Sequence, residues 1–153
     1  MIKRAFKKLW IIQRLKKQGA NLNDLINIYV KQVRSILEFG VPVWNSGLTQ
    51  EEVIDIERVQ KAFLHIALKD DYRDYQSALS KTNLETLVVR RFKLSKNFAL
   101  KTSKHPKHSK WFVKTKSGTN TQSNKPIYKM PLCRLTRTRK GPIPYPTSLL
   151  NSK

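Results

Sequence analysis

The sequence predicts an all-α fold, a small helical bundle of about four helices with a mostly irregular basic C-terminal tail. Apolar residues recur at steps of three and four up to about residue 103. Capping patterns and glycine stops divide that part of the chain into segments of helical length. Six of the seven prolines lie beyond residue 104, where the apolar period ends, so we expect irregular structure there.

The first expected helix covers residues 2–18, and the segment 1–19 reads as a basic amphipathic helix. Its apolar positions at helical spacing are Ile2, Ala5, Phe6, Leu9 and Ile12. Lys and Arg lie between them, and Gly19 ends the helix.

The second expected helix follows an N-terminal cap made by Asn21, with Asp24 three residues later. Its apolar stripe is Leu22, Ile26, Tyr29, Val33 and Ile36, and the stripe is widened by Leu25, Ile28, Val30 and Leu37. A helix this apolar is expected to pack on more than one side.

A break is expected after this helix. Gly40 can take the left-handed conformation that ends a helix, and Pro42 disfavours helical geometry at the residue before it. Trp44 is then expected in a short connection, where its indole closes the end of the bundle; the alternative is a nucleotide-stacking surface. Thr49 and Glu52 have the spacing of a capping box that opens the next helix.

The third expected helix runs to about Leu68, and its apolar face is Val53, Ile56, Val59, Phe63 and Ile66. A polar link at 69–74 and a short helix at 75–81 follow. Thr82 and Glu85 have the spacing of a second capping box. The fourth expected helix has Leu84, Leu87, Leu94 and Phe98 on one face, with Arg91 on the line of that stripe.

The charges are strongly segregated along the chain. The net charge is +21, yet all ten acidic residues lie at or before Glu85, and residues 86–153 hold 17 basic residues and none that is acidic. A polycation of this kind binds polyanions, nucleic acid first and anionic membrane second. One cysteine, Cys133, fits a reducing compartment, so we expect an intracellular protein of the nucleus or cytoplasm. No apolar run approaches the length of a membrane span.

The candidate nucleic-acid-binding residues are 12 of the 17 cations in residues 86–153 and one interleaved indole. Cations contact phosphates, and aromatic side chains stack on unpaired bases, without sequence specificity from the phosphate contacts. The set is Arg90, Lys93, Lys96, Lys101, Lys104, Lys107, Lys110, Trp111, Lys114, Arg134, Arg137, Arg139 and Lys140.

We expect no catalytic residue, metal or cofactor. Asp70 and Asp71 form a carboxylate pair in a polar link, without a third carboxylate in a recognisable place. His105, His108 and Cys133 match no standard zinc module. The chain also has no Gly-rich phosphate loop and no recognisable catalytic triad.

Several motifs give the chain a resemblance to the C-terminal region of non-LTR retrotransposon reverse transcriptases. They follow one another, in the order and spacing of that family, over about 120 residues. They are VRSILEFGVPVW at 33–44, Glu57-Arg-Val-Gln60 with Lys61-Ala62, Tyr75, Ala78-Leu79, Leu84-Glu-Thr-Leu87, Arg90-Arg91, Gly141-Pro-Ile-Pro-Tyr145 and Leu149-Leu-Asn151. Gly141 stands where the family leads us to expect Ser, and Pro146 where it leads us to expect Leu.

The resemblance implies that residues 20–103 are a thumb-like helical region, followed by a basic Pro/Ser-containing tail at 104–153. Fingers, palm and the metal-holding aspartates of the polymerase are missing, so the resemblance implies a truncated copy that is not an enzyme. The expected function is non-catalytic binding of nucleic acid, RNA or RNA–DNA hybrid. The alternatives are an inert or protein-interacting fragment with exposed apolar helix faces, and a membrane binder acting through residues 2–18.

Overall fold

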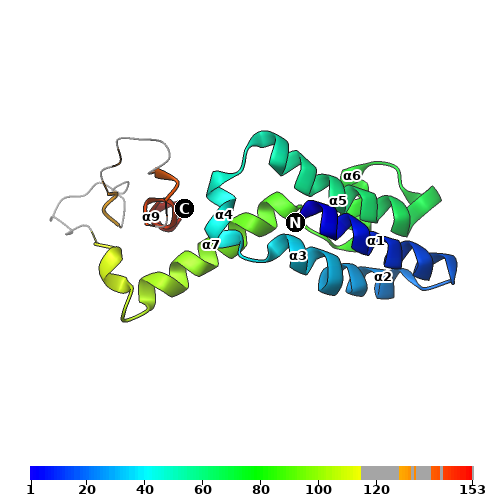
Figure 1. Ribbon diagram of the computed structural model, residues 1–153, viewed down its shortest axis with the longest axis horizontal. Coiled ribbons are helices and arrows are strands. Elements are labelled where there is room, and N and C mark those ends of the chain that lie inside the picture. The colour runs from blue at the N-terminus through cyan, green and yellow to red at the C-terminus, as the bar shows by residue number, and fades with distance from the viewer. Residues whose placement is uncertain (115–127, 132, 134–138, 142, 153) are drawn as a thin grey trace. The chain divides into compact units, whose positions relative to one another are not determined.

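The computed structural model describes residues 1–114, 128–131, 133, 139–141 and 143–152. The protein is all-α, as predicted, and the only extended pairing in those ranges is an isolated antiparallel bridge between Lys114 and Tyr128 (Figure 1). The chain divides into two compact units. The first unit comprises 1–41 and 48–91, and the second unit comprises 42–47 and 92–153.

The first unit is built around α1 (Ile2–Lys17) and α5 (Gln50–Leu68), which pack against each other. Ala5, Leu9 and Ile12 of α1 are buried, as the apolar period predicts. The helix stops where Gly19 takes a φ of +88°. The apolar face of the amphipathic helix α1 is therefore part of the core of the first unit.

A continuous helical stretch then runs through α2 (Leu22–Ile28), a π-helical turn (Tyr29–Arg34) and α3 (Ser35–Glu38). It begins at the predicted cap, where Asn21 Oδ1 accepts a hydrogen bond from the Asp24 N–H at 3.0 Å. The buried residues are Leu25, Tyr29, Val33 and Leu37, at uniform steps of four. All four belong to the predicted apolar set, and they share one face because the wider π-helical turn keeps residues four apart aligned. Leu22, Ile26 and Ile36 of the predicted stripe are partly buried.

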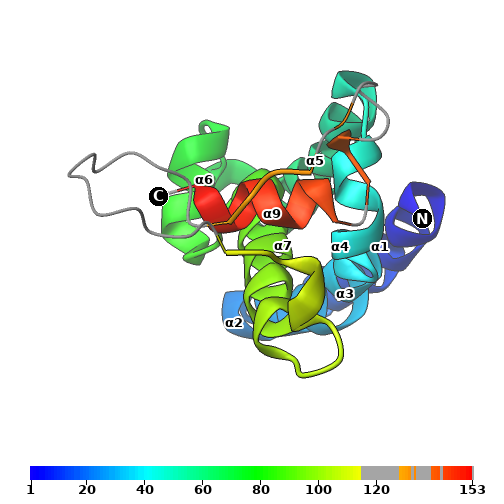
Figure 2. The same cartoon turned by 90° about the vertical axis from the view of Figure 1, so that its left-hand side faces the viewer.

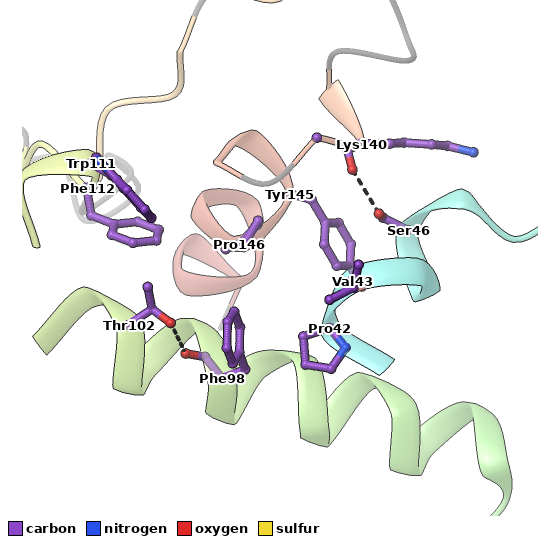
Figure 3. A pocket seen from close by; sticks show the side chains of 11 residues that line it. Pro42, Val43, Ser46, Phe98, Thr102, Trp111, Phe112, Lys140, Tyr145 and Pro146 are labelled. Atoms are coloured by element: carbon purple, nitrogen blue, oxygen red, sulfur yellow. Dashed lines mark hydrogen bonds between the residues drawn. The ribbon is translucent and has the colours of Figure 1, made fainter. Parts of the chain in front are cut away.

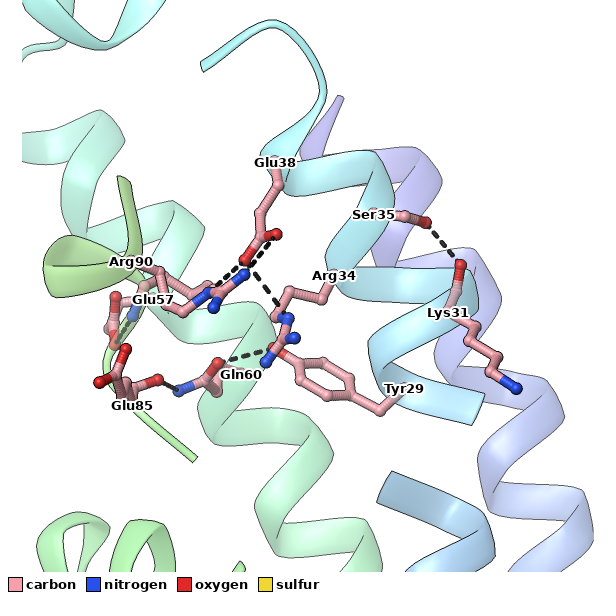
Figure 4. Close-up of polar contacts among 10 residues, drawn as sticks. Tyr29, Lys31, Arg34, Ser35, Glu38, Glu57, Gln60, Glu85 and Arg90 are labelled. Carbon is pink, nitrogen blue, oxygen red and sulfur yellow. Dashed lines mark hydrogen bonds and ion pairs between the residues drawn. The ribbon is translucent and has the colours of Figure 1, made fainter. Parts of the chain in front are cut away.

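A polar network lies inside this unit, on the central helix α5 (Figure 4). The Gln60 side chain is fully buried. Its Oε1 accepts a hydrogen bond from the Tyr29 hydroxyl at 2.8 Å, and its Nε2 donates to Tyr75 Oη at 3.2 Å and to the Glu85 carbonyl at 2.9 Å. The Tyr75 hydroxyl in turn donates to Glu57 Oε1. One amide thus joins the π-helical turn, α6 (Tyr75–Thr82) and the segment after α6.

The start of α7 (Leu87–Lys104) differs from the predicted one. Thr82 is the last residue of α6, and its hydroxyl donates back to the Ala78 carbonyl at 2.8 Å, while Asn83 takes a positive φ of 52°. The predicted capping box at Thr82 and Glu85 was therefore wrong. Thr86 Oγ1 accepts a hydrogen bond from the Val89 N–H instead, at 3.3 Å, so the capping hydroxyl lies four residues later.

The connection between α3 and α5 is more helical than predicted. Gly40 does take a positive φ, +66°, but Val41–Trp44 then forms the single-turn helix α4, followed by a 3-10 turn at Asn45–Gly47. Pro42 is tolerated because the first turn of a helix leaves its N–H groups without intrahelical partners. Trp44 is only partly buried and belongs to the second unit, and its place at the end of the helical bundle stays a prediction. The capping box of Thr49 and Glu52 is confirmed in both directions.

The second unit combines the later part of α7 with a 3-10 turn (Ser109–Trp111) and α9 (Pro144–Asn151), which crosses α7 (Figure 2). Its small core consists of Ala99, Phe112 and Leu150, with Tyr128 packed against it. The Asn151 side chain bonds both backbone polar groups of Tyr128. Its Oδ1 accepts a hydrogen bond from the Tyr128 N–H, and its Nδ2 donates one to the Tyr128 carbonyl, each at 2.9 Å. The tail thus carries a helix that the sequence pattern did not predict.

The Gln60 network yields a prediction about stability. Gln60→Leu keeps the volume but leaves the hydroxyls of Tyr29 and Tyr75 without this partner inside the unit, which should lower the free energy of unfolding by about 1–3 kcal/mol. Urea unfolding followed by circular dichroism measures this change. The matched control is Gln13→Leu at an exposed position of α1, where a change below about 0.5 kcal/mol is expected. Equal effects of the two variants would contradict a structural role for the network.

A second prediction concerns alkaline pH. Burial raises the pKa of Tyr29 well above its ordinary value of 10.0. Tyr29 therefore contributes stability that is complete below the unfolded-state pKa, near 10, and is lost as pH rises above it, because the unfolded chain then releases a proton that the folded chain keeps. Above about pH 10 the unfolding free energy of the wild-type protein falls as pH rises. In Tyr29→Phe the slope of this fall should be smaller by about 1.4 kcal/mol per pH unit. An unchanged slope in urea titrations at several alkaline pH values would contradict this assignment.

Candidate nucleic-acid interface

One candidate cation, Arg90, already has an acidic partner in the first unit. Its Nε donates to Glu38 Oε1 at 2.8 Å, and its terminal nitrogen donates to Glu38 Oε2 at 3.0 Å (Figure 4). Arg34, one turn before Glu38, forms an ion pair with the same carboxylate at 3.3 Å. The hydrogen bonds to Glu38 raise the pKa of the Arg90 guanidinium. Arg90 therefore ties α7 to α3.

A second candidate, Lys96, is bound within the second unit. Its Nζ donates to the Ser152 carbonyl at 3.0 Å, just beyond the C-terminus of α9, and lies 5.9 Å from the centre of the Phe92 ring. A cation at the C-terminal end of a helix is favoured by the helix dipole and by the carbonyls that lack helical partners. Lys96 therefore connects α7 with α9, while its neighbour Lys93 has an exposed side chain.

Most of the remaining candidates have exposed side chains in the second unit. Lys101 and Lys104 lie in the last turn of α7, and the chain continues from there through the 3-10 turn. The exposed set is Lys101, Lys104, Lys107, Lys110, Lys114, Arg139 and Lys140. Arg134 and Arg137 lie outside the described residues.

The second unit cannot neutralise these cations with its own side chains. Its sequence holds 15 basic residues and no Asp or Glu, whereas the first unit holds 16 basic and all ten acidic residues. A unit with this excess of basic over acidic side chains creates a positive potential that attracts polyanions. The acidic residues, which are confined to one part of the sequence, thus all belong to one of the two compact units.

Trp111 is 45% exposed, as a stacking role requires. Its ring centre lies 4.4 Å from that of His108, which stacks on His105 at 4.9 Å. The turn that carries these rings is fixed by backbone hydrogen bonds, among them Trp111 N–H to the His108 carbonyl at 3.0 Å. The indole therefore contacts a neighbouring ring while nearly half of Trp111 stays exposed.

Trp111 also borders a pocket of about 460 Å³ that belongs wholly to the second unit (Figure 3). Its walls come from α4, α7, the 3-10 turn and the start of α9, and they include Val43, Phe98, Tyr145 and Pro146. Phe98 belongs to the predicted apolar face of the fourth helix, and its side chain is 47% exposed. Tyr145 appeared in a tail motif, and only the folding back of α9 reveals that both residues line one pocket.

In the parts of the chain that the structure describes, no group of three His, Cys, Asp or Glu side chains is arranged to hold a metal ion. Among the same residues, every helix is too short or too polar to cross a bilayer.

Some candidate cations, such as Arg90, are bonded within the protein, whereas others have exposed side chains. This difference gives a prediction. Arg90→Met leaves the partly buried Glu38 without its bidentate partner and should lower the free energy of unfolding by about 1–2 kcal/mol, with nucleic-acid affinity changed less than about twofold. Urea unfolding and fluorescence anisotropy on an RNA–DNA hybrid measure the two quantities. Arg58→Met removes an exposed ion pair with Asp55 and serves as the control, with an expected change below about 0.5 kcal/mol. A large loss of affinity at normal stability would assign Arg90 to the interface instead.

Comparisons with protein-family models, curated proteins and solved structures each found no significant match to this chain.

Proposed function

We propose that this protein binds nucleic acid without catalysis, through phosphate contacts made by its second unit. The observation that carries the proposal is the composition of that unit, which has 15 basic residues and no acidic side chain. Five of its lysines, from Lys101 to Lys114, have exposed side chains along 14 consecutive residues. Each phosphate contact releases a condensed counterion, so such a surface gains affinity from any nucleic-acid backbone.

The proposed partner is RNA or RNA–DNA hybrid, bound without sequence specificity, because phosphate contacts carry no sequence information. A membrane partner through α1 is less well supported. An interfacial helix needs a free apolar face, whereas Ala5, Leu9 and Ile12 are buried in the first unit. The nucleus or the cytoplasm is the compartment proposed for this activity.

We further propose that the chain is related to the thumb, and the region after it, of a retrotransposon RNA-directed DNA polymerase. Support comes from the roles of the residues that carry the resemblance. Gln60 and Tyr75 connect helices in the first unit, as does Arg90. In the second unit the Tyr145 hydroxyl accepts a hydrogen bond from Asn45 Nδ2 at 3.0 Å. Residues of these motifs thus connect helices, which is the role expected in a thumb-like helical scaffold.

A protein-interaction fragment is the second candidate, and exposed apolar side chains favour it. Phe39 is 82% exposed and Val43 is 84% exposed, and Phe92 of α7 is also exposed. Apolar surface of this kind is common where a protein contacts a partner. Association driven by such surface changes little with salt or strengthens, whereas phosphate binding weakens, so ionic strength separates the two functions.

The salt dependence of binding tests the proposal. Affinity for a labelled RNA–DNA hybrid should fall steeply with salt, and the slope of log affinity against log salt should be smaller by roughly 3 units in the fourfold variant K101A/K104A/K107A/K110A. Fluorescence anisotropy over a series of salt concentrations measures the slope. The matched control K3A/K7A/K17A/K31A removes four exposed lysines from the first unit and should leave most of the slope.

Two results would overturn the proposal. One is the absence of binding to any nucleic acid at low salt by the folded chain. The other is an equal loss of slope in both fourfold variants, because the second unit would then have no special part in binding.

A further inference from the structure

The pocket beside Trp111 has the size and the walls of a ligand site. Its volume of about 460 Å³ lies within the range of small-molecule pockets, roughly 300–1,000 Å³. Phe98 forms one wall, Trp111 and Phe112 a second, and Tyr145 with Val43 a third, with Pro146 between them (Figure 3). We call this site the aromatic pocket. Aromatic side chains thus supply much of its wall.

The pocket is open to solvent although most of its wall is apolar. Phe98 and Trp111 are each nearly half exposed, while Phe112 beneath them is 5% exposed and belongs to the core of the unit. Exposed aromatic surface supported by a fixed core is the arrangement on which unpaired bases stack. The cost of exposing these rings would be removed by a ligand that covers them.

The positive charge around the aromatic pocket favours a ligand that carries negative charge. Lys140 lines the pocket, Lys101 directly precedes the lining residue Thr102, and Lys110 directly precedes Trp111. The unit holds no acidic side chain, so a second copy of this chain, with its net charge of +21, would be repelled. A nucleotide instead brings a phosphate for the lysines and an aromatic base for the pocket.

Polar groups at the pocket wall fit the edge of a base. The Tyr145 hydroxyl accepts a hydrogen bond from Asn45 and also carries a donor of its own. The Thr102 hydroxyl donates to the Phe98 carbonyl at 2.8 Å, and the Ser46 hydroxyl donates to the Lys140 carbonyl at 2.8 Å, so the oxygens of both side chains are oriented as acceptors. An aliphatic side chain would leave these groups without partners.

We infer that the aromatic pocket takes an unpaired nucleobase from single-stranded RNA or DNA, stacked on Trp111 and Phe98, while the neighbouring lysines contact the flanking phosphates. This inference rests on the proposed function, since the phosphate contacts bring the strand to the pocket. It adds a preference for strands with accessible bases over duplexes. A base in a duplex is already stacked on its neighbours and cannot enter.

The test compares three labelled or competing polyanions on the full chain: a short oligouridine or oligothymidine, a duplex with the same number of phosphates, and inorganic polyphosphate. Trp111→Ala should weaken single-strand binding by roughly 5- to 150-fold and duplex or polyphosphate binding by less than about twofold. Trp111→Phe keeps an aromatic face and should retain most of the affinity. The control Trp10→Ala removes a more exposed indole, 59% exposed, which belongs to α1 and lies outside the pocket.

Tryptophan fluorescence gives a second measurement of binding. It uses the wild-type protein and Trp111→Phe, so it does not require truncation of Trp111 to Ala. Oligouridine should quench the emission of the wild-type protein more than that of Trp111→Phe, and polyphosphate should quench neither. Circular dichroism of each variant confirms that the helices are intact.

The outcomes separate the two proposals. If wild-type protein binds no polyanion, the proposed function fails and the pocket inference fails with it. If it binds, but Trp111→Ala weakens single-strand, duplex and polyphosphate binding alike or weakens none, the base pocket is overturned while phosphate binding stands. A selective loss on single strands, together with quenching that depends on Trp111, supports the inference.

Discussion

One buried amide determines how the helices of the first unit meet. Gln60 accepts from one tyrosine, donates to another and donates to the Glu85 carbonyl, so it makes three directional contacts from a fully buried position. A buried polar group of this kind costs free energy unless every partner is in place, and this requirement disfavours other packings of the same apolar faces. Around it, Tyr29 stacks on Phe63 with ring centres 4.0 Å apart, and Glu57 Oε1 accepts the Leu87 N–H at 3.1 Å. The first turn of α7 is thereby fixed by a helix 30 residues earlier in the chain.

The second unit follows a different constraint. Its described core is small, Ala99 with Phe112 and Leu150, and it has no acidic side chain to offset its 15 basic ones. Mutual repulsion opposes compaction in such a unit, and the described contacts that hold α9 are mainly neutral, such as the Asn151 bonds to Tyr128. A polyanion that binds the folded form would stabilise it by mass action. Folding and nucleic-acid binding would then be linked in this unit, whereas the first unit is held by its own buried contacts.

The sequence predicted features that depend on neighbours in the chain. The all-α class, the Asn21 cap and the capping box at Thr49 followed from local spacing. Features set by distant partners were missed: the π-helical turn around Tyr29 and the shift of a cap from Thr82 to Thr86 accompany contacts to α5. At the candidate interface, charge alone selected the cations. It could not show that Arg90 and Lys96 already have partners, or that Phe98 lines a pocket closed by residues more than 40 positions later.

The proposed function requires that nucleic acid contacts the second unit and leaves the first uncovered. Lysine-acylation footprinting of the full chain, with mass spectrometry, in the presence and absence of an RNA–DNA hybrid tests it directly. We expect protection of Lys101, Lys104, Lys107, Lys110 and Lys114, with unchanged reactivity at the exposed lysines Lys17, Lys31 and Lys61 of the first unit. Protection spread equally over both units, or concentrated on α1, would contradict it.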